Sequence, residues 1–94
     1  MIEWTEQAAG QLDHVYDYIA LDAGEDAALR VTLKVVKTLE RLTVFPMSGR
    51  AGRIAGTREL VIPDTPFIAA YAVEHQRIVI LALYHGARRW PDTL

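Results

Sequence analysis

Six basic side chains in the second half of the chain could bind an anion or transfer a proton: Arg50, Arg53, Arg58, His85, Arg88 and Arg89. Guanidinium groups hold phosphate oxygens through paired hydrogen bonds, and imidazole exchanges a proton near neutral pH. The side chains of Tyr71, Tyr84 or Trp90 could stack on a nucleic-acid base. The chemistry to expect is therefore phosphate binding, with His85 as a candidate general acid or base.

Each of these residues also has a purely structural interpretation. The two loop arginines could be surface charges, Arg58 could pair with a helix carboxylate, and His85 could cap the end of a strand. Trp90 could close the core instead of stacking on a base. Tyr71 lies within the apolar run "FIAAYAV", which predicts a core position.

Other kinds of site find little support. The sequence has no cysteine, and its three histidines are too scattered for metal-ligand spacing. The glycine-rich stretch "SGRAGRIAG" lacks the Lys-Ser/Thr of a phosphate-binding loop. Most acidic residues fall on the expected outer faces of helices, which argues against paired-carboxylate hydrolysis. No metal or cofactor is therefore expected.

Charge is distributed unevenly along the chain. The net charge is −2, but the first 29 residues carry seven acidic side chains and no Lys or Arg. Residues 30–94 carry all ten Lys and Arg against five acidic side chains, which is a local charge of +5. Either these charges simply solvate the surface, or the basic part of the chain binds an anion or an acidic partner.

Hydrophobic periodicity predicts the elements that must position these groups. Thr5 is a good helix N-cap, and Pro46 ends the second helical pattern. We expect strands at residues 1–4, 57–62, 67–73 and 77–84, helices at 6–21 and 25–44, and a loop at 46–56. The expected fold is a single α+β domain over residues 1–94, ordered β-α-α-β-β-β. In it a helical hairpin packs on one face of a small, mainly antiparallel sheet.

The expected topology does not gather the basic residues into one site. The last two strands are near-continuous apolar runs, which predicts central places in the sheet. In a three-stranded meander the first and third strands run the same way. Arg58, at the start of one, and His85, at the end of the other, are then at opposite ends, unless the loops fold back.

Four stretches together give the chain a resemblance to the RelE/ParE toxin family of bacterial type II toxin–antitoxin systems, also called plasmid stabilisation proteins. They are Pro46-x-Ser48-Gly49-Arg50, Gly56-Thr57-Arg58-Glu59-Leu60, the strand from Pro66 to Tyr71, and Tyr84-His85-Gly86-Ala87-Arg88. The resemblance covers the whole chain and implies the same β-α-α-β-β-β fold. It also implies a growth-arresting toxin that a co-expressed antitoxin holds inactive.

Members of this family have two kinds of target. One branch cuts mRNA in the ribosome without a metal, and the resemblance would then make His85, Arg58 and Arg50 the catalytic groups. That branch typically has an arginine where this chain has Ile68, and a tyrosine near a C-terminus that here reads "WPDTL". The other branch poisons DNA gyrase. We therefore favour a ParE-like, gyrase-directed toxin. A RelE-like ribosome-dependent mRNA endoribonuclease is the alternative, and a nontoxic small binding domain is a further one.

The resemblance also implies partners. We expect Arg53, Arg88 and Arg89 to contact the target or the antitoxin, while Trp90 anchors the tail. The antitoxin should be acidic and should fold on binding, and the complex could be a heterotetramer. No apolar run approaches the roughly 20 residues that span a bilayer, and "MIEWTEQ" does not resemble a secretion signal, so a cytoplasmic protein is expected.

Overall fold

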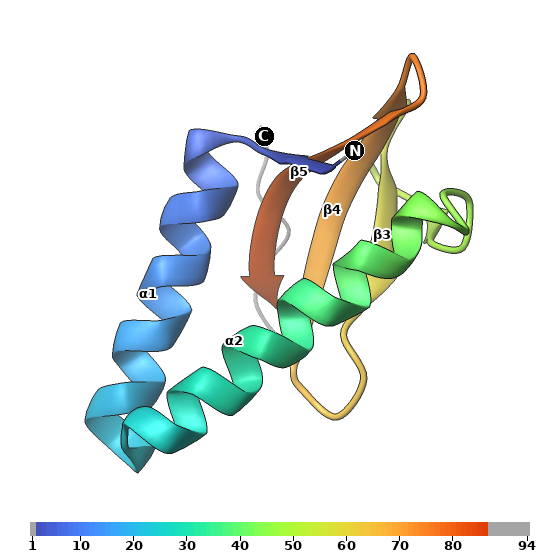
Figure 1. The fold of residues 1–94 in the computed structure, drawn as a ribbon. Coiled ribbons are helices and arrows are strands. Elements are labelled where there is room, and N and C mark those ends of the chain that lie inside the picture. Colours follow the sequence, from blue (N-terminus) through green and yellow to red (C-terminus); the bar gives the residue numbers. More distant parts are fainter. Residues whose placement is uncertain (1, 87–94) are drawn as a thin grey trace.

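The computed structural model describes residues 2–86, which form two helices and a five-stranded sheet (Figure 1). The elements are β1 (Ile2–Trp4), α1 (Glu6–Ala23), α2 (Glu25–Glu40), the 3-10 helix η1 (Arg41–Thr43), β2 (Arg50–Ala51), β3 (Arg58–Val61), β4 (Phe67–Glu74) and β5 (Arg77–His85). The strand order is β1-β5-β4-β3-β2. The predicted α+β arrangement is confirmed, and β4 and β5 are central as predicted.

The sheet is mainly antiparallel, because only β1 pairs in parallel, with β5. A two-residue turn joins β4 to β5, with positive φ at His75 and Gln76, as the twist of a tight hairpin favours. One register shift interrupts that hairpin, since Tyr71 pairs with Ile80 while Ala70 pairs with Ala82. Leu81 is therefore an extra residue that bends β5.

The helix boundaries differ slightly from those predicted. The hydroxyl oxygen of Thr5 accepts a hydrogen bond from the Ala8 N–H at 3.0 Å and caps α1, as expected. α1 continues to Ala23 and ends at Gly24, whose φ of 96° suits glycine. α2 ends at Glu40, earlier than the predicted residue 44, and the chain tightens into η1 before Pro46. Within residues 2–86, neither helix is long and apolar enough to cross a membrane.

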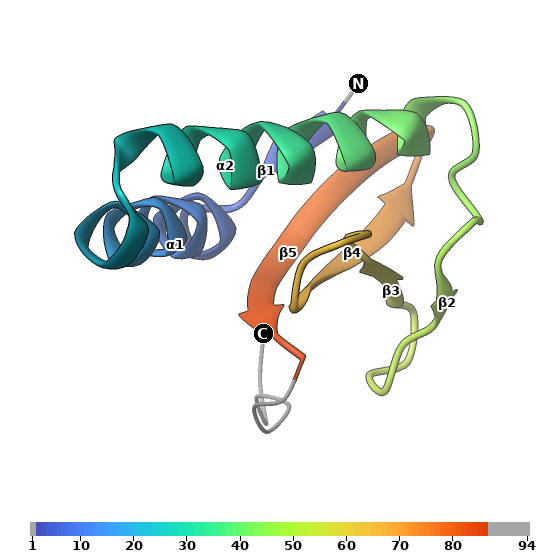
Figure 2. The same cartoon turned by 90° about the horizontal axis from the view of Figure 1, so that it is seen from below.

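The core lies between the helices and one face of the sheet. α2 crosses that face, while α1 lies beside β5, and β2 is at the far end of the sheet (Figures 1 and 2). The core members come from both layers: Ala8, Val35, Leu39, Leu42, Ile62, Ala69, Tyr71, Ile78, Ile80 and Leu83. Each large aliphatic side chain buried in this way contributes about 1.5–3 kcal/mol to stability.

The second half of β5 would be an open edge without α1, because β1 pairs only with Ile78–Ile80. Two side chains near the start of α1 take the place of a strand. The Thr5 hydroxyl donates to the Leu81 carbonyl at 3.3 Å, and the Gln11 Oε1 accepts the Leu83 N–H at 2.7 Å. The position of α1 is thus fixed by hydrogen bonds as well as by packing.

A buried tyrosine attaches the loop after η1 to the sheet. Tyr71 is fully buried, as predicted, and its hydroxyl donates to the Pro46 carbonyl at 2.8 Å and accepts the Gly49 N–H at 2.9 Å. A Cβ at Gly49 would lie 2.6 Å from the tyrosine oxygen and 2.8 Å from the Glu59 carbonyl oxygen, so only glycine fits there. We call these contacts the Tyr71 clamp.

The clamp accounts for a strand that the sequence pattern did not predict. The loop expected at 46–56 contains β2, in which Arg50 pairs with Glu59 and Ala51 with Arg58. Two residues are too few to show a period of two, so the pattern could not reveal this strand. Because the clamp holds Gly49 against β3, the next two residues are placed to pair with it.

The first prediction concerns the clamp. Tyr71→Phe should lower the free energy of unfolding by about 1–3 kcal/mol, because it leaves the Gly49 N–H and the Pro46 carbonyl without their partner. Gly49→Ala should cost a similar amount, about 1–3 kcal/mol, by overpacking. Urea denaturation of the purified variants measures both effects.

The matched control is Gly10→Ala on the exposed side of α1, where a Cβ would meet nothing within 4 Å. It should raise the free energy of unfolding by about 0.8–1 kcal/mol through helix propensity. Equal effects of alanine at positions 10 and 49 would contradict the clamp.

Candidate functional site

Arg50 of β2 and the turn that follows this strand are organised around one carboxylate, that of Glu59 on β3. Its side chain is 4% exposed, and its Oε1 accepts hydrogen bonds from the Arg50 Nη2 at 3.0 Å and Nε at 3.2 Å. Its Oε2 accepts the Arg53 backbone N–H at 3.3 Å. A buried carboxylate without such donors would be costly, so Glu59 holds both arginine-bearing positions against β3. We call Glu59, Arg50, Arg53 and Tyr84 the Glu59 cluster.

Tyr84 joins this cluster from β5. Burial raises the pKa of Tyr84 from 10.0 to about 12, and the negative charge of Glu59 and a hydrogen bond with it act in the same direction. The charges of Arg53 and Arg50 partly oppose the shift. The phenol is therefore protonated at neutral pH, and it serves as a hydrogen-bonding group rather than as a base.

Arg58 points to the other face of β3, because side chains alternate along a strand. Its Nη1 donates to the Gly49 carbonyl at 2.7 Å and to the Met47 carbonyl at 3.3 Å. The pairing with a helix carboxylate considered from the sequence does not occur. Arg58 instead holds the same loop segment as the Tyr71 clamp.

His85 ends β5 and packs against Phe67, with ring centroids 5.9 Å apart and the planes at 81°. Arg58 pairs across the sheet with Tyr71, whereas His85 pairs with Phe67, four residues along β4. The Cα atoms of Arg58 and His85 are therefore about 16 Å apart. This distance combines four residues of about 3.3 Å each along the strands with two strand spacings of about 4.8 Å across the sheet. The expectation that these residues lie at opposite ends is confirmed.

Of the six predicted residues, the structure brings Arg50 and Arg53 together at Glu59, places Arg58 on the opposite face of β3 and leaves His85 at the other end of the sheet. The other two, Arg88 and Arg89, lie outside the described residues, as does Trp90. Within residues 2–86, no group of three potential ligand side chains could hold a metal ion. What the arrangement can do is present arginines at one end of the sheet to an anionic or acidic surface.

Sequence reasoning did not identify Glu59 or Tyr84 as members of this cluster. Glu59 stands on the face of β3 opposite to its neighbour Arg58, which alternation alone could have indicated. Its pairing with Arg50 could not be found, because it depends on β2. Tyr84 reaches Glu59 across the width of β4, and no local pattern reveals such a contact.

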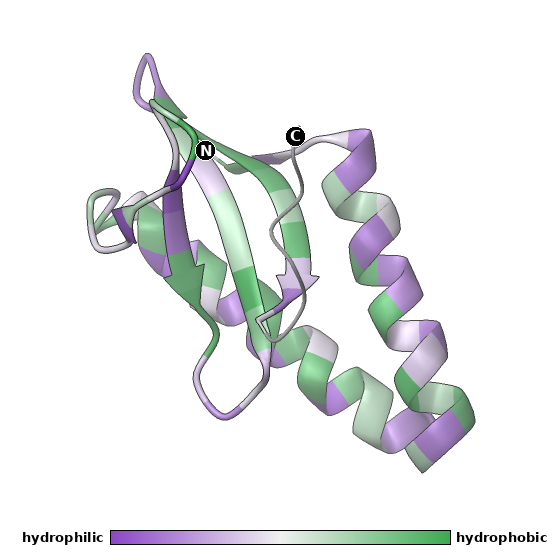
Figure 3. Cartoon of the chain, turned by 180° about the vertical axis from the view of Figure 1, so that it is seen from behind, coloured by the Kyte–Doolittle hydropathy of each residue, from purple (hydrophilic) through white to green (hydrophobic). Residues whose placement is uncertain are grey.

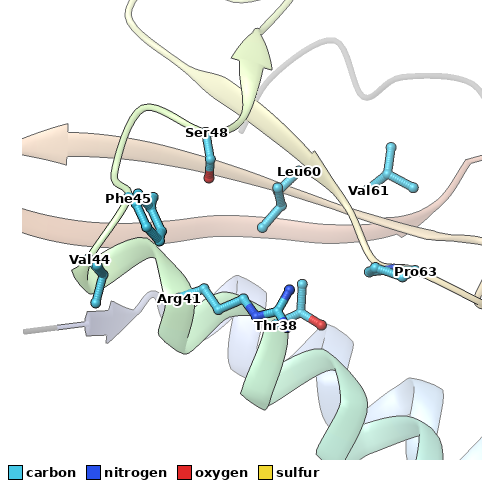
Figure 4. Close-up of a pocket in the computed structure, with 8 residues that line it drawn as sticks. All are labelled: Thr38, Arg41, Val44, Phe45, Ser48, Leu60, Val61 and Pro63. Atoms are coloured by element: carbon cyan, nitrogen blue, oxygen red, sulfur yellow. The ribbon is translucent and has the colours of Figure 1, made fainter.

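An apolar groove of about 520 Å³ lies on the other side of the clamp, between the end of α2 and β3 (Figure 4). It is lined by Thr38, Arg41, Val44, Phe45, Ser48, Leu60, Val61 and Pro63. Figure 3 shows that β3 changes along its length from hydrophilic to hydrophobic. Its residues in order are Arg58, Glu59, Leu60 and Val61. The charged cluster and the apolar groove therefore share one short strand.

The second prediction is the titration of Tyr84. Because its folded pKa lies above its unfolded value, its contribution to stability is complete below pH 10 and is lost as the pH rises through about 12. Glu59→Gln should move this pKa back toward 10, though not completely, since burial persists. NMR titration of ring-labelled tyrosine follows Tyr84 directly.

Glu74→Gln, an exposed carboxylate at the far end of β4, is the matched control and should leave the titration of Tyr84 unchanged. A Tyr84 that titrates near pH 10 in the unmodified protein would be inconsistent with the cluster.

The chain is similar to known proteins along nearly its whole length. A sequence model of the family described as "ParE toxin of type II toxin-antitoxin system, parDE" matches residues 2–90. The Sinorhizobium fredii (strain NBRC 101917 / NGR234) protein named "Putative toxin Y4kP" is 40% identical over 93 residues, which cover 99% of this chain and 95% of that protein.

A solved structure of the chromosomal ParDE toxin–antitoxin system from P. aeruginosa contains a similar chain. It superimposes with a TM-score of 0.83 at 29% identity, over 89% of this chain and 92% of that one. Sequence and structure agree over nearly the whole length, and the chain belongs to the ParE family of type II toxin–antitoxin toxins, whose systems pair each toxin with a cognate antitoxin.

Proposed function

We propose that this toxin arrests growth by acting on DNA gyrase in the bacterial cytoplasm, and that an acidic antitoxin which folds on binding neutralises it. We further propose that toxin and antitoxin assemble as a heterotetramer. Arg53, Arg88 and Arg89 are the proposed contacts with the target or the antitoxin.

The choice of gyrase over ribosome-bound mRNA as the target rests on the contacts that the candidate catalytic groups already make within the protein. The Arg58 guanidinium is bonded to loop carbonyls, and that of Arg50 to Glu59. His85 is about 16 Å from Arg58 along and across the sheet. Cutting RNA at one phosphate needs an acid, a base and a cation within hydrogen-bonding distance of it.

Two further positions support this choice. Ile68 stands on β4 between Val61 and Tyr84, where the nuclease branch has an arginine, and it offers no donor to a phosphate. The Tyr71 hydroxyl is fully buried, and it already donates to one backbone group and accepts from another. A tyrosine in this state is poorly placed to activate a ribose 2′-hydroxyl.

Charge supports the acidic antitoxin. Residues 30–86 carry eight Lys and Arg against four acidic side chains, whereas residues 2–29 carry seven acidic side chains and no Lys or Arg. An acidic segment would be attracted to the sheet side and repelled by α1. A segment that is disordered when free pays its ordering cost on binding and can follow such an extended surface.

The third prediction tests the target. Expression without the antitoxin should stop growth, and the purified protein should inhibit supercoiling by gyrase while ribosome-bound mRNA stays intact. Arg53→Ala, and separately Arg88→Ala combined with Arg89→Ala, should each reduce inhibition by about tenfold or more if the arginines meet carboxylates or phosphates. Supercoiling and mRNA-cleavage assays are run in parallel on the same preparations.

Arg77→Ala is the control, because Arg77 pairs with Glu3 at 2.8 Å away from the Glu59 cluster, and it should keep full potency. Codon-positioned cuts in mRNA would refute the gyrase proposal in favour of the endoribonuclease. In that case His85→Ala should slow cleavage by about 10²–10⁴-fold.

A further inference from the structure

We propose that the outer side of α2 binds the phosphate backbone of duplex DNA, so that the toxin contacts the DNA that gyrase holds as well as gyrase itself. The inference rests on the proposed action on gyrase, an enzyme that works on duplex DNA, and it names a second contact of the toxin. Three features of the described residues carry it: a regular row of four cations, charged ends that are available to a ligand, and an uneven distribution of acidic residues.

The row consists of Arg30, Lys34, Lys37 and Arg41, at intervals of four, three and four residues. Such intervals place side chains on one side of a helix, and Arg41 keeps the helical conformation at the C-cap of α2. All four residues are exposed, and we call them the α2 stripe. The buried residues of α2 face the core instead, and they are Ala28, Val35, Thr38 and Leu39. Figure 2 shows α2 lying over the sheet, with its outer side turned away from it.

The length of the α2 stripe suits a phosphate backbone. Eleven residues separate Arg30 from Arg41, so at a rise of about 1.5 Å per residue the stripe is about 16.5 Å long. One strand of B-DNA presents a phosphate about every 3.4 Å along the axis, which gives about five phosphates over this length. Lys and Arg bind phosphate through charge and N–H donors, and they need no apolar pocket to do so.

The charged ends of the stripe are available to such a ligand. Within residues 2–86, only Lys34 of the four forms an ion pair, with Asp64 at 2.9 Å. The side chain of Asp64 is 85% exposed, and an ion pair exposed in this way contributes little to stability. A phosphate can therefore replace the carboxylate at Lys34. It displaces no ion-pair partner in this part of the chain at Arg30, Lys37 or Arg41.

The acidic residues indicate which part of α2 the DNA approaches. Exposed carboxylates lie along α1 and around the tip of the helical hairpin, at Asp13, Asp17, Asp22, Glu25 and Asp26. Residues 30–41, by contrast, contain the four cations and a single acidic residue, Glu40. A polyanion is repelled from the tip and attracted to the later part of α2. There α2 crosses the sheet, away from α1 (Figure 1).

A regular polyanion fits this surface better than an acidic protein segment does. The nearest exposed apolar residues in sequence are Leu29 and Leu33, and leucines are under-represented among the residues that anchor protein interfaces. The outer side of a helix is also convex, so it does not shield charge pairs from water. Binding to DNA requires neither an apolar anchor nor a hollow, because the release of counterions from the phosphates drives it.

The fourth prediction concerns binding of a fluorescent 20-base-pair DNA duplex in the absence of gyrase. A plot of log affinity against log salt concentration should have a slope of about −3 to −4, because four cations replace counterions. The double variant Arg30→Gln with Lys37→Gln keeps helix propensity nearly constant. It should bind about tenfold or more weakly at about 0.1 M salt and reduce the slope by about 2. Fluorescence anisotropy measures both quantities, and thermal melts check that the variant is folded.

The matched control compares two single variants that each remove one positive charge from an exposed side chain. Lys37→Gln should reduce the slope of the salt dependence by about 1. Arg77→Gln should leave the slope unchanged, because Arg77 pairs with Glu3 between β5 and β1, away from the α2 stripe. In supercoiling assays with gyrase, the double variant should inhibit less strongly than the unmodified toxin, whereas Arg77→Gln should inhibit equally.

The outcomes separate this inference from the function on which it rests. If the toxin inhibits gyrase but does not bind the duplex at low salt, the stripe is not a DNA site and gyrase remains the target. Equal effects of Lys37→Gln and Arg77→Gln on the salt dependence would also overturn the stripe. If the toxin binds the duplex through the stripe but leaves supercoiling intact, the proposed target fails and the DNA site stands. Binding of single-stranded RNA at least tenfold more tightly than the duplex would overturn the choice of DNA.

Discussion

The hydroxyl of one buried tyrosine determines where the Glu59 cluster and the apolar groove lie. By holding the Pro46 carbonyl and the Gly49 N–H, Tyr71 attaches the loop after α2 to the middle of the sheet. Val44 and Phe45, immediately before the clamp, form the wall of the groove. Immediately after it, β2 begins and brings Arg50 to Glu59. An unpaired buried hydroxyl or amide is costly, so this loop cannot move without losing stability.

The clamp gives structural contacts to residues that suggest catalysis in the sequence. A tyrosine within a central strand and an arginine at the start of its neighbour could activate and hold a phosphodiester. In this chain, however, Tyr71 and Arg58 both bond to the backbone of residues 46–49. A side chain that already satisfies buried backbone groups has little freedom to bind a substrate. Residue type and spacing do not reveal these backbone contacts, whereas the hydrogen-bond partners do.

The sequence could predict those features that depend on interactions between residues close together along the chain. Helical spacing in α1 and α2 and the apolar runs of β4 and β5 are local signals, and they placed these elements correctly within a few residues. The N-cap at Thr5 could also be predicted from the sequence. By contrast, the bond from Gln11 to the Leu83 N–H spans 72 residues, and the contact of Glu59 with Tyr84 depends on the sheet register. A two-residue strand such as β2 carries no period at all, so the cluster built on it could not be predicted.

The two halves of β3 connect the charged cluster to the groove. Its start carries Arg58 and Glu59 and is covered by β2, while its end carries Leu60 and Val61 and is open. Arg50 pairs with Glu59, two residues along β3 from the exposed Val61, and Arg53 lies beyond it in the turn that follows β2. A surface that meets this edge of the sheet therefore finds an exposed guanidinium and exposed apolar side chains close together.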